Sequence, residues 1–244
     1  RFTPPLSEDW TAAFDEDTKI LMIGLPNLDI TWTGNAGDFD WTNAENWSPR
    51  VPDDGTYVTL APAQTAEISL PADGTAFLAR LTLSGGPVAF AGGTLRVDEL
   101  IADELTSALA VAEGSEVVVS SRLSASAGLN LAEKALLVIS NDLAMTFATA
   151  VGGAGEVRKE GEGTLTLVGP VSCAGGLTLA EGLTRLGAEN AAGAKVSVAA
   201  GASLDLAGFG GVKELVVAGA GDGLGRPWAL TSSGASSAGV TNVV

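Results

Sequence analysis

The chain has no histidine and only one cysteine, Cys173, among its 244 residues. Without imidazole it has no Ser-His triad, no Cys-His pair and no histidine-based zinc site. One thiol excludes an internal disulfide and a thiolate metal cage. Since no base is available to activate it, we interpret Cys173 as a small core residue. Catalysis would have to rely on carboxylates, lysine, arginine or tyrosine alone, so we expect no enzyme activity and no cofactor.

Basic residues are also scarce, with 13 Lys and Arg against 29 Asp and Glu and a net charge of −16. They are scattered singly and cannot neutralise a phosphate backbone, so we expect no nucleic-acid partner. No apolar stretch approaches the roughly 20 residues that span a bilayer, so we expect no membrane span. The chain begins Arg1-Phe2 without a methionine, which indicates a mature or excised piece of a longer protein.

Short alternating runs recur from residue 56 onward, among them TYVTL (56–60), GTLTLV (163–168) and ELVVA (214–218). Their period of two and their content of Val, Thr and Leu predict β-strands. Glycine-rich segments between the runs predict turns. Residues 98–113 are close to a helical spacing, but they also fit two short strands, which is the interpretation that we adopt.

The strand-bearing units repeat about every 20 residues, a period typical of stacked coils. An antiparallel sandwich would need hairpin turns between neighbouring strands. Only three Asp-Gly pairs occur, and two of them, Asp54-Gly55 and Asp73-Gly74, come before residue 80. The sequence therefore predicts an all-β protein whose coils form a parallel β-helix, or β-solenoid, with stacked rows of small apolar side chains inside.

Residues 152–187, GGAGEVRKEGEGTLTLVGPVSCAGGLTLAEGLTRLG, have a specific glycine pattern. They resemble the autotransporter-associated β-strand repeat, although Pro170 departs from its usual pattern. The matching positions are Gly153, Gly155, Lys159, Gly161, Gly163, Thr164, Leu165, Leu167, Gly169, Gly175, Gly176, Gly182 and Leu186. The resemblance implies a right-handed parallel β-helix in a secreted or surface-anchored bacterial protein, of a kind that is mostly not enzymatic.

Three of the five tryptophans, Trp32, Trp41 and Trp47, lie in the segment TWTGNAGDFDWTNAENWSP (31–49). This segment resembles one that is common near such repeats. A solenoid leaves an apolar end and unpaired strand edges at its first coil, and large aromatic side chains can cover them. We therefore predict an aromatic-rich N-terminal cap. The alternative is a carbohydrate platform on which the indoles stack against sugar rings.

Asp38 and Asp40, together with Asn43, carry oxygen atoms at a spacing that a calcium loop could use. The segment lacks the glycine and the terminal glutamate of an EF-hand. We interpret these residues as a solvated turn, and the sequence leaves a calcium ion open.

The chain divides in sequence into residues 1–30, an arm or the end of a preceding domain, residues 31–55, the cap, and residues 56–244, the repeats. Two apolar segments suggest self-association. One is the strand formed by Ile20, Leu21, Met22 and Ile23, and the other is the C-terminal run with Val240, Val243 and Val244. An unpaired edge at the C-terminal run could accept a strand from another chain or a following coil.

These observations predict a non-enzymatic structural module of an extracellular bacterial surface protein: a stalk, spacer, adhesin passenger or filament subunit. The alternative is a carbohydrate-binding or polysaccharide-cleaving domain on the same scaffold. A cleaving site needs acids and a basic residue on one face. The arginines occur singly in the sequence, although stacking could align residues of successive coils; they are Arg80, Arg96, Arg122, Arg158 and Arg185.

Overall fold

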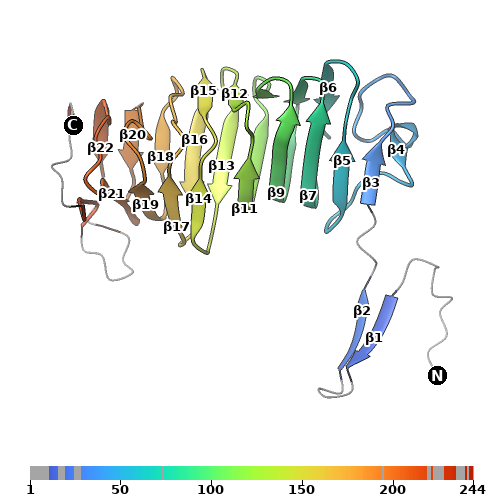
Figure 1. Ribbon diagram of the computed structural model, residues 1–244, viewed down its shortest axis with the longest axis horizontal. Coiled ribbons are helices and arrows are strands. Elements are labelled where there is room, and N and C mark those ends of the chain that lie inside the picture. The colour runs from blue at the N-terminus through green and yellow to red at the C-terminus, as the bar shows by residue number, and fades with distance from the viewer. Residues whose placement is uncertain are drawn as a thin grey trace.

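The computed structural model describes residues 29–72, 74–193 and 195–218, several positions between 221 and 243 (221, 228–234, 240, 242 and 243), and the backbone of residues 11–15 and 20–24. Parallel strands stack into a β-solenoid of about eight turns (Figure 1). The described residues contain no α-helix and one short 3₁₀ helix, η1 (Ala44–Asn46). None of their helices has the length and apolar character needed to cross a membrane. The predicted all-β solenoid is confirmed.

The strands form three sheets along the solenoid and one separate pair. In spatial order, the eleven-stranded sheet contains β22 (Glu214–Val217), β20 (Lys195–Val198), β18 (Leu177–Leu179), β16 (Glu156–Glu160), β13 (Leu136–Ser140), β11 (Glu116–Ser124), β9 (Thr94–Leu105), β7 (Thr75–Gly85), β5 (Tyr57–Leu60), β3 (Asp29–Trp32) and β4 (Trp47–Ser48). One five-stranded sheet contains β15 (Val151–Gly153), β12 (Leu129–Leu131), β10 (Leu109–Val111), β8 (Val88–Ala91) and β6 (Ala66–Ser69). The other contains β14 (Met145–Phe147), β17 (Thr164–Leu167), β19 (Gly182–Leu186), β21 (Ala202–Asp205) and β23 (Leu230–Thr231).

The register of the large sheet fixes the length of each coil. Val118 pairs with Val138, Val138 with Arg158, and Arg158 with Thr178, always 20 residues apart. Other coils are slightly shorter or longer, since Arg80 pairs with Glu99 whereas Thr59 pairs with Thr82. The repeat of about 20 residues predicted from the sequence is therefore the length of one turn.

Three long strands, β7, β9 and β11, turn a corner of the solenoid without a break. The register between β11 and β9 shifts between Val119 and Arg122, where the strand bends. Beyond the bend, Arg122–Ser124 pair with residues 99–101 of β9. Further along the solenoid the two sides of this corner are separate strands, and β14 lies against β11. Residues 98–113, which could have been a helix, form most of β9 together with β10, as predicted.

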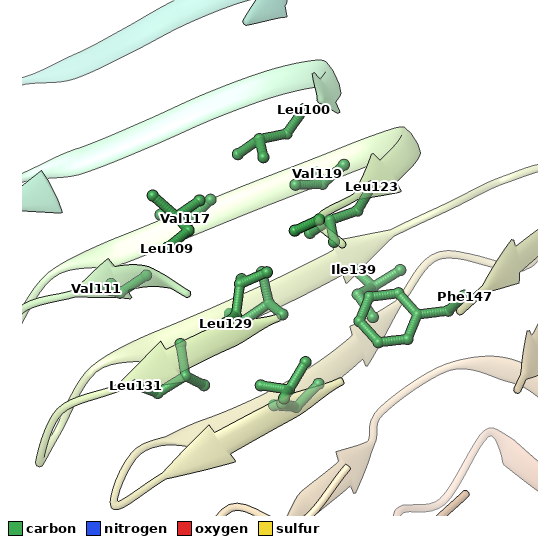
Figure 2. Close-up of a cluster of buried hydrophobic side chains, with 14 of the residues drawn as sticks. Leu100, Leu109, Val111, Val117, Val119, Leu123, Leu129, Leu131, Ile139 and Phe147 are labelled. Carbon is green, nitrogen blue, oxygen red and sulfur yellow. The ribbon is translucent and has the colours of Figure 1, made fainter. Parts of the chain in front are cut away.

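The core consists of inward-facing rows of aliphatic side chains, one from each turn (Figure 2). In one row every side chain is at most 1% exposed, and register partners follow one another in the order Leu95, Val117, Leu137, Val157, Leu177, Val196 and Leu215. Alternation of side chains along a strand places every second residue inside, so the period of two becomes this stacked row. Each turn is thereby held by the turn on either side of it.

The N-terminal end of the solenoid begins at β3, which pairs in parallel with β5 and antiparallel with β4. The boundary predicted between residues 30 and 31 therefore falls inside β3, because Asp29 and Ile30 already pair with Tyr57 and Val58. Further upstream, β1 (Thr11–Asp15) and β2 (Ile20–Gly24) pair with each other in an antiparallel sheet of their own.

Candidate functional site

The three tryptophans of residues 31–49 pack together at the first coil. Trp47 lies edge-on to both Trp32 and Trp41, with ring centroids 4.8 Å apart in each pair. The indole nitrogen of Trp47 donates a hydrogen bond of 2.7 Å to the carbonyl oxygen of Trp41. The ring of Phe39 stacks on that of Trp32, with the ring centroids 6.4 Å apart. These contacts cover the end of the core, so the predicted aromatic-rich cap is present.

The exposure of these indoles bears on the alternative of a sugar platform. Trp32, Trp41 and Trp47 are 7%, 2% and 5% exposed, and all three belong to the hydrophobic core. A ring that stacks on a sugar has to present a face to solvent. In this structure their faces lie against one another and against the first coil, so they act in packing.

The acidic residues beside the cap hold its loop together. The Asp38 carboxylate accepts hydrogen bonds from the side chains of Asn43 at 2.7 Å and Asn46 at 2.6 Å and from the backbone N–H of Asp40. The Asn43 bond, followed by the other two, lowers the pKa of Asp38. Asp40 accepts two bonds from Thr42. Among the described residues, no three acidic or thiol side chains are grouped so that they could hold a metal ion.

The residues predicted to mediate assembly lie at the two ends of the chain. Ile20, Leu21, Met22 and Ile23 belong to β2, whose partner strand is β1. Val240 and Val243 form isolated parallel bridges with Val212 and Leu215. Val240 packs against the core, Val243 is exposed, and Val244 lies outside the described residues. Self-association through these segments stays a prediction.

Two ionisable residues have buried structural roles that sequence reasoning did not assign. Lys159 faces inward and is fully buried, and its Nζ atom donates to the carbonyl oxygens of Glu160 at 2.7 Å, Gly161 at 2.6 Å and Glu181 at 3.4 Å. Burial lowers the pKa of Lys159 to about 8, although nearby carboxylates oppose the shift. The alternation Val157-Arg158-Lys159 was the signal that could have placed this lysine inside.

Asp205 is the acidic counterpart of Lys159 near the C-terminal end of the solenoid. Burial alone would raise its pKa, but hydrogen bonds from Ser233, from the backbone of Ala207 and from Arg185 hold the pKa of Asp205 at about 2. Cys173 is also buried, and burial raises the pKa of its thiol to about 11. The thiol is therefore protonated at neutral pH, as expected for a core residue.

A groove runs along the bent corner on the outside of β7, β9, β11 and β13. It consists of three depressions of about 250, 290 and 220 Å³. The first two share Ser120 and Ser140, the first and third share Asp98, and the second and third share Ser121. We call these joined depressions the corner groove.

The side chains around the corner groove come from rows that stacking brings into register. On one side, Phe77 pairs with Arg96 and Arg96 with Val118. The floor consists of short side chains, and the Ser120 hydroxyl donates a hydrogen bond of 2.6 Å to Asp98. Val118 faces outward between the inward-facing Val117 and Val119, yet it too is buried, since it lies at the bottom of the groove.

The other side of the corner groove carries a row of residues, most of them charged, that come from successive turns of the solenoid. Arg80 binds the Glu99 carboxylate through both Nε and Nη2 at 2.7 Å, and its guanidinium lies 5.1 Å from the centre of the Tyr57 ring. Arg122 is the register partner of Glu99 in the next turn. The arginines that are isolated in the sequence are thus aligned here with an acid and an aromatic ring. Sequence reasoning missed this row because it depends on the register between coils.

Comparison with protein-family models, with curated proteins and with solved structures finds no match to this chain. The resemblance of residues 152–187 to the autotransporter-associated repeat therefore stays a hypothesis. The solenoid, its cap and the corner groove are the features of the molecule that bear on its function.

Proposed function

We propose that the chain is a non-enzymatic structural module, a stalk or spacer, of an extracellular bacterial surface protein. The observation that carries this proposal is the unbroken inward row from Leu95 to Leu215, which joins successive turns through in-register parallel strands. Each turn adds a fixed rise of about 4.8 Å, the distance between neighbouring strands. A stack of this kind keeps its ends at a constant separation, which is what a spacer needs. The glycine pattern of residues 152–187 supports a surface protein.

The test is the distance between the two ends of the solenoid. Spin labels on Asn35→Cys and Lys213→Cys, both at exposed positions, should give a narrow distance distribution near about 40 Å for about eight turns. Cys173 need not be removed, since it is buried and its raised pKa keeps it unreactive towards the label. A broad distribution would contradict a rigid spacer.

A second version of the chain tests whether the turns are modular. Residues 137–156 form one full turn, because Leu137 and Val157 are register partners. Duplicating this segment should lengthen the label separation by about 5 Å while the circular dichroism stays that of a β protein. An unchanged separation, or a chain that no longer folds, would show that the turns are not interchangeable spacers.

Extracellular placement needs its own experiment. Antibodies raised against the purified chain should label intact cells of the source bacterium. Labelling that appears only after the cells are permeabilised would contradict a surface protein and leave the rigid-spacer measurement unaffected.

A further inference from the structure

The corner groove combines features that a spacer does not require. Six large apolar side chains are exposed among the described residues, and two of them, Phe77 at 47% and Leu143 at 82%, line this groove. Between them lie the hydroxyls of Ser120 and Ser140 and the carboxylate of Asp98. Solvent-facing apolar side chains on either side of a polar hollow are typical of a binding site rather than of a packed surface.

The hollow follows from the choice of side chains at the corner. Large residues such as Phe77 and Arg96 stand on one side and Arg80 and Glu99 on the other, whereas Ser120, Ser121 and Ser140 occupy the bend. Val119 pairs with Ile139, so Ser120 and Ser140, the residues that follow them, lie in neighbouring turns and line the same depression. The result is an elongated groove that crosses several turns instead of a closed pocket.

One cation in the groove is available to a ligand. No ion pair or hydrogen bond joins the Arg96 guanidinium to any residue that the structure describes, and its register partner on one side is Phe77. Arg80, by contrast, is neutralised by Glu99. A planar donor beside an aromatic ring offers hydrogen bonds and an apolar face to the same ligand.

We propose that the corner groove binds a neutral polysaccharide chain that lies along the solenoid axis. A sugar ring presents C–H groups on its face and hydroxyls around its edge. The faces would rest on Phe77 and Leu143, while the hydroxyls would bond to Asp98, Ser120 and Arg96. The groove crosses several turns, so it suits an extended chain of sugar units rather than a single one.

Charge selects a neutral chain over an acidic one. Among the described residues no ion pair joins the carboxylates of Asp54, Asp98 and Asp142, although Asp98 accepts a hydrogen bond from Ser120. Within the same residues, the guanidinium groups without an ion pair are that of Arg96 in the groove and that of Arg122 in the row beside it. The whole chain carries a net charge of −16. A polyuronate or a nucleic acid would therefore be repelled along most of the groove. This site lies outside the cap tryptophans, and its existence does not depend on the spacer role proposed above.

The experiment begins with an array of neutral glycans (cellulose, xylan, mannan and laminarin oligosaccharides) and acidic ones (polygalacturonate and alginate). We expect the protein to bind at least one of the neutral glycans and neither of the acidic ones. Absence of any neutral ligand, or stronger binding of the acidic polymers, overturns the proposal.

Three variants then locate the binding by titration calorimetry. Phe77→Ala should weaken the affinity for the retained glycan by roughly tenfold, which is the upper end of the range for one aromatic contact. Ser140→Tyr should abolish binding, because it fills the floor of the groove. Val168→Ala, which removes an exposed apolar side chain elsewhere, is the matched control and should bind like the parent chain. Equal weakening in Val168→Ala, or full binding by Phe77→Ala, overturns the assignment, and circular dichroism checks that each variant is folded.

Discussion

The buried amine of Lys159 makes the stability of the solenoid depend on alkaline pH in a predictable way. Its side chain is surrounded by the core of its own turn and by three carbonyl oxygens of the adjoining corner. An ammonium group in this position has lost most of its hydration, and burial lowers its pKa from 10.5 to about 8. In the unfolded chain the same amine is hydrated and has its ordinary pKa.

The direction and size of the effect follow from proton linkage. Between about pH 8 and pH 10.5 the unfolded chain holds a proton on Lys159 that the folded chain has released. The free energy of unfolding therefore rises with pH across this window. Each unit of pKa difference corresponds to about 1.4 kcal/mol, so the full rise is about 3 kcal/mol. Below pH 8 both states are charged and the contribution is constant.

The assay is urea unfolding followed by circular dichroism at several pH values between 7 and 11, for the parent chain and for Lys159→Met. The parent chain should gain about 3 kcal/mol relative to the variant over this range. Lys134→Met is the control, since Lys134 is largely exposed and, within the part of the chain that the structure describes, forms an ion pair with Glu113 at the surface. Its pH response should follow that of the parent. Parallel responses of the parent chain and Lys159→Met would refute the assignment of a desolvated amine.

Three other substitutions test the cap, the buried acid and a corner. Trp41→Ala should lower the free energy of unfolding by about 3–5 kcal/mol, while the exposed Trp228→Ala should change it by less than about 0.5 kcal/mol in the same thermal melts. Since the pKa of Asp205 is held at about 2, its ionised form stabilises the fold above about pH 4, and up to about 2 kcal/mol should be lost towards pH 2 in acid titrations, but not in Asp205→Asn. Gly161→Ala should destabilise more than Gly114→Ala in urea unfolding: both glycines have positive φ, 79° and 70°, but only at Gly161 would a Cβ atom meet a neighbouring carbonyl.

Local sequence pattern was sufficient to predict the architecture because the solenoid is built from local rules. In Val117 and Val119, or Leu137 and Ile139, the period of two specifies which side faces the core. The repeat length then places each such pair on the pair one turn away. Contacts between distant parts of the chain did not have to be predicted, because each turn contacts only its neighbours.

The corner groove could not be predicted in the same way, because coil length varies from turn to turn. Arg80 meets Glu99 after 19 residues, whereas Tyr57 meets Arg80 after 23. A prediction that assumes one fixed repeat length would have placed these three residues in different rows. Val118 and its register partner Val138 face outward on their strands, yet they are only 4% and 3% exposed. The sequence contains no local signal for this burial or for the register shift between Val119 and Arg122.

The same division explains how one chain could serve as the proposed spacer and also carry the proposed binding groove. In a solenoid each turn contacts only its neighbours, and stability is close to a sum over turns and their interfaces. The inward row fixes the rise of each turn, while outward side chains such as Phe77, Arg96 and Ser140 contribute little to that packing. Substitutions in the corner groove should therefore alter the proposed binding without changing the length of the stack. The cap tryptophans lack this freedom, since Trp41 and Trp47 hold the first turn closed.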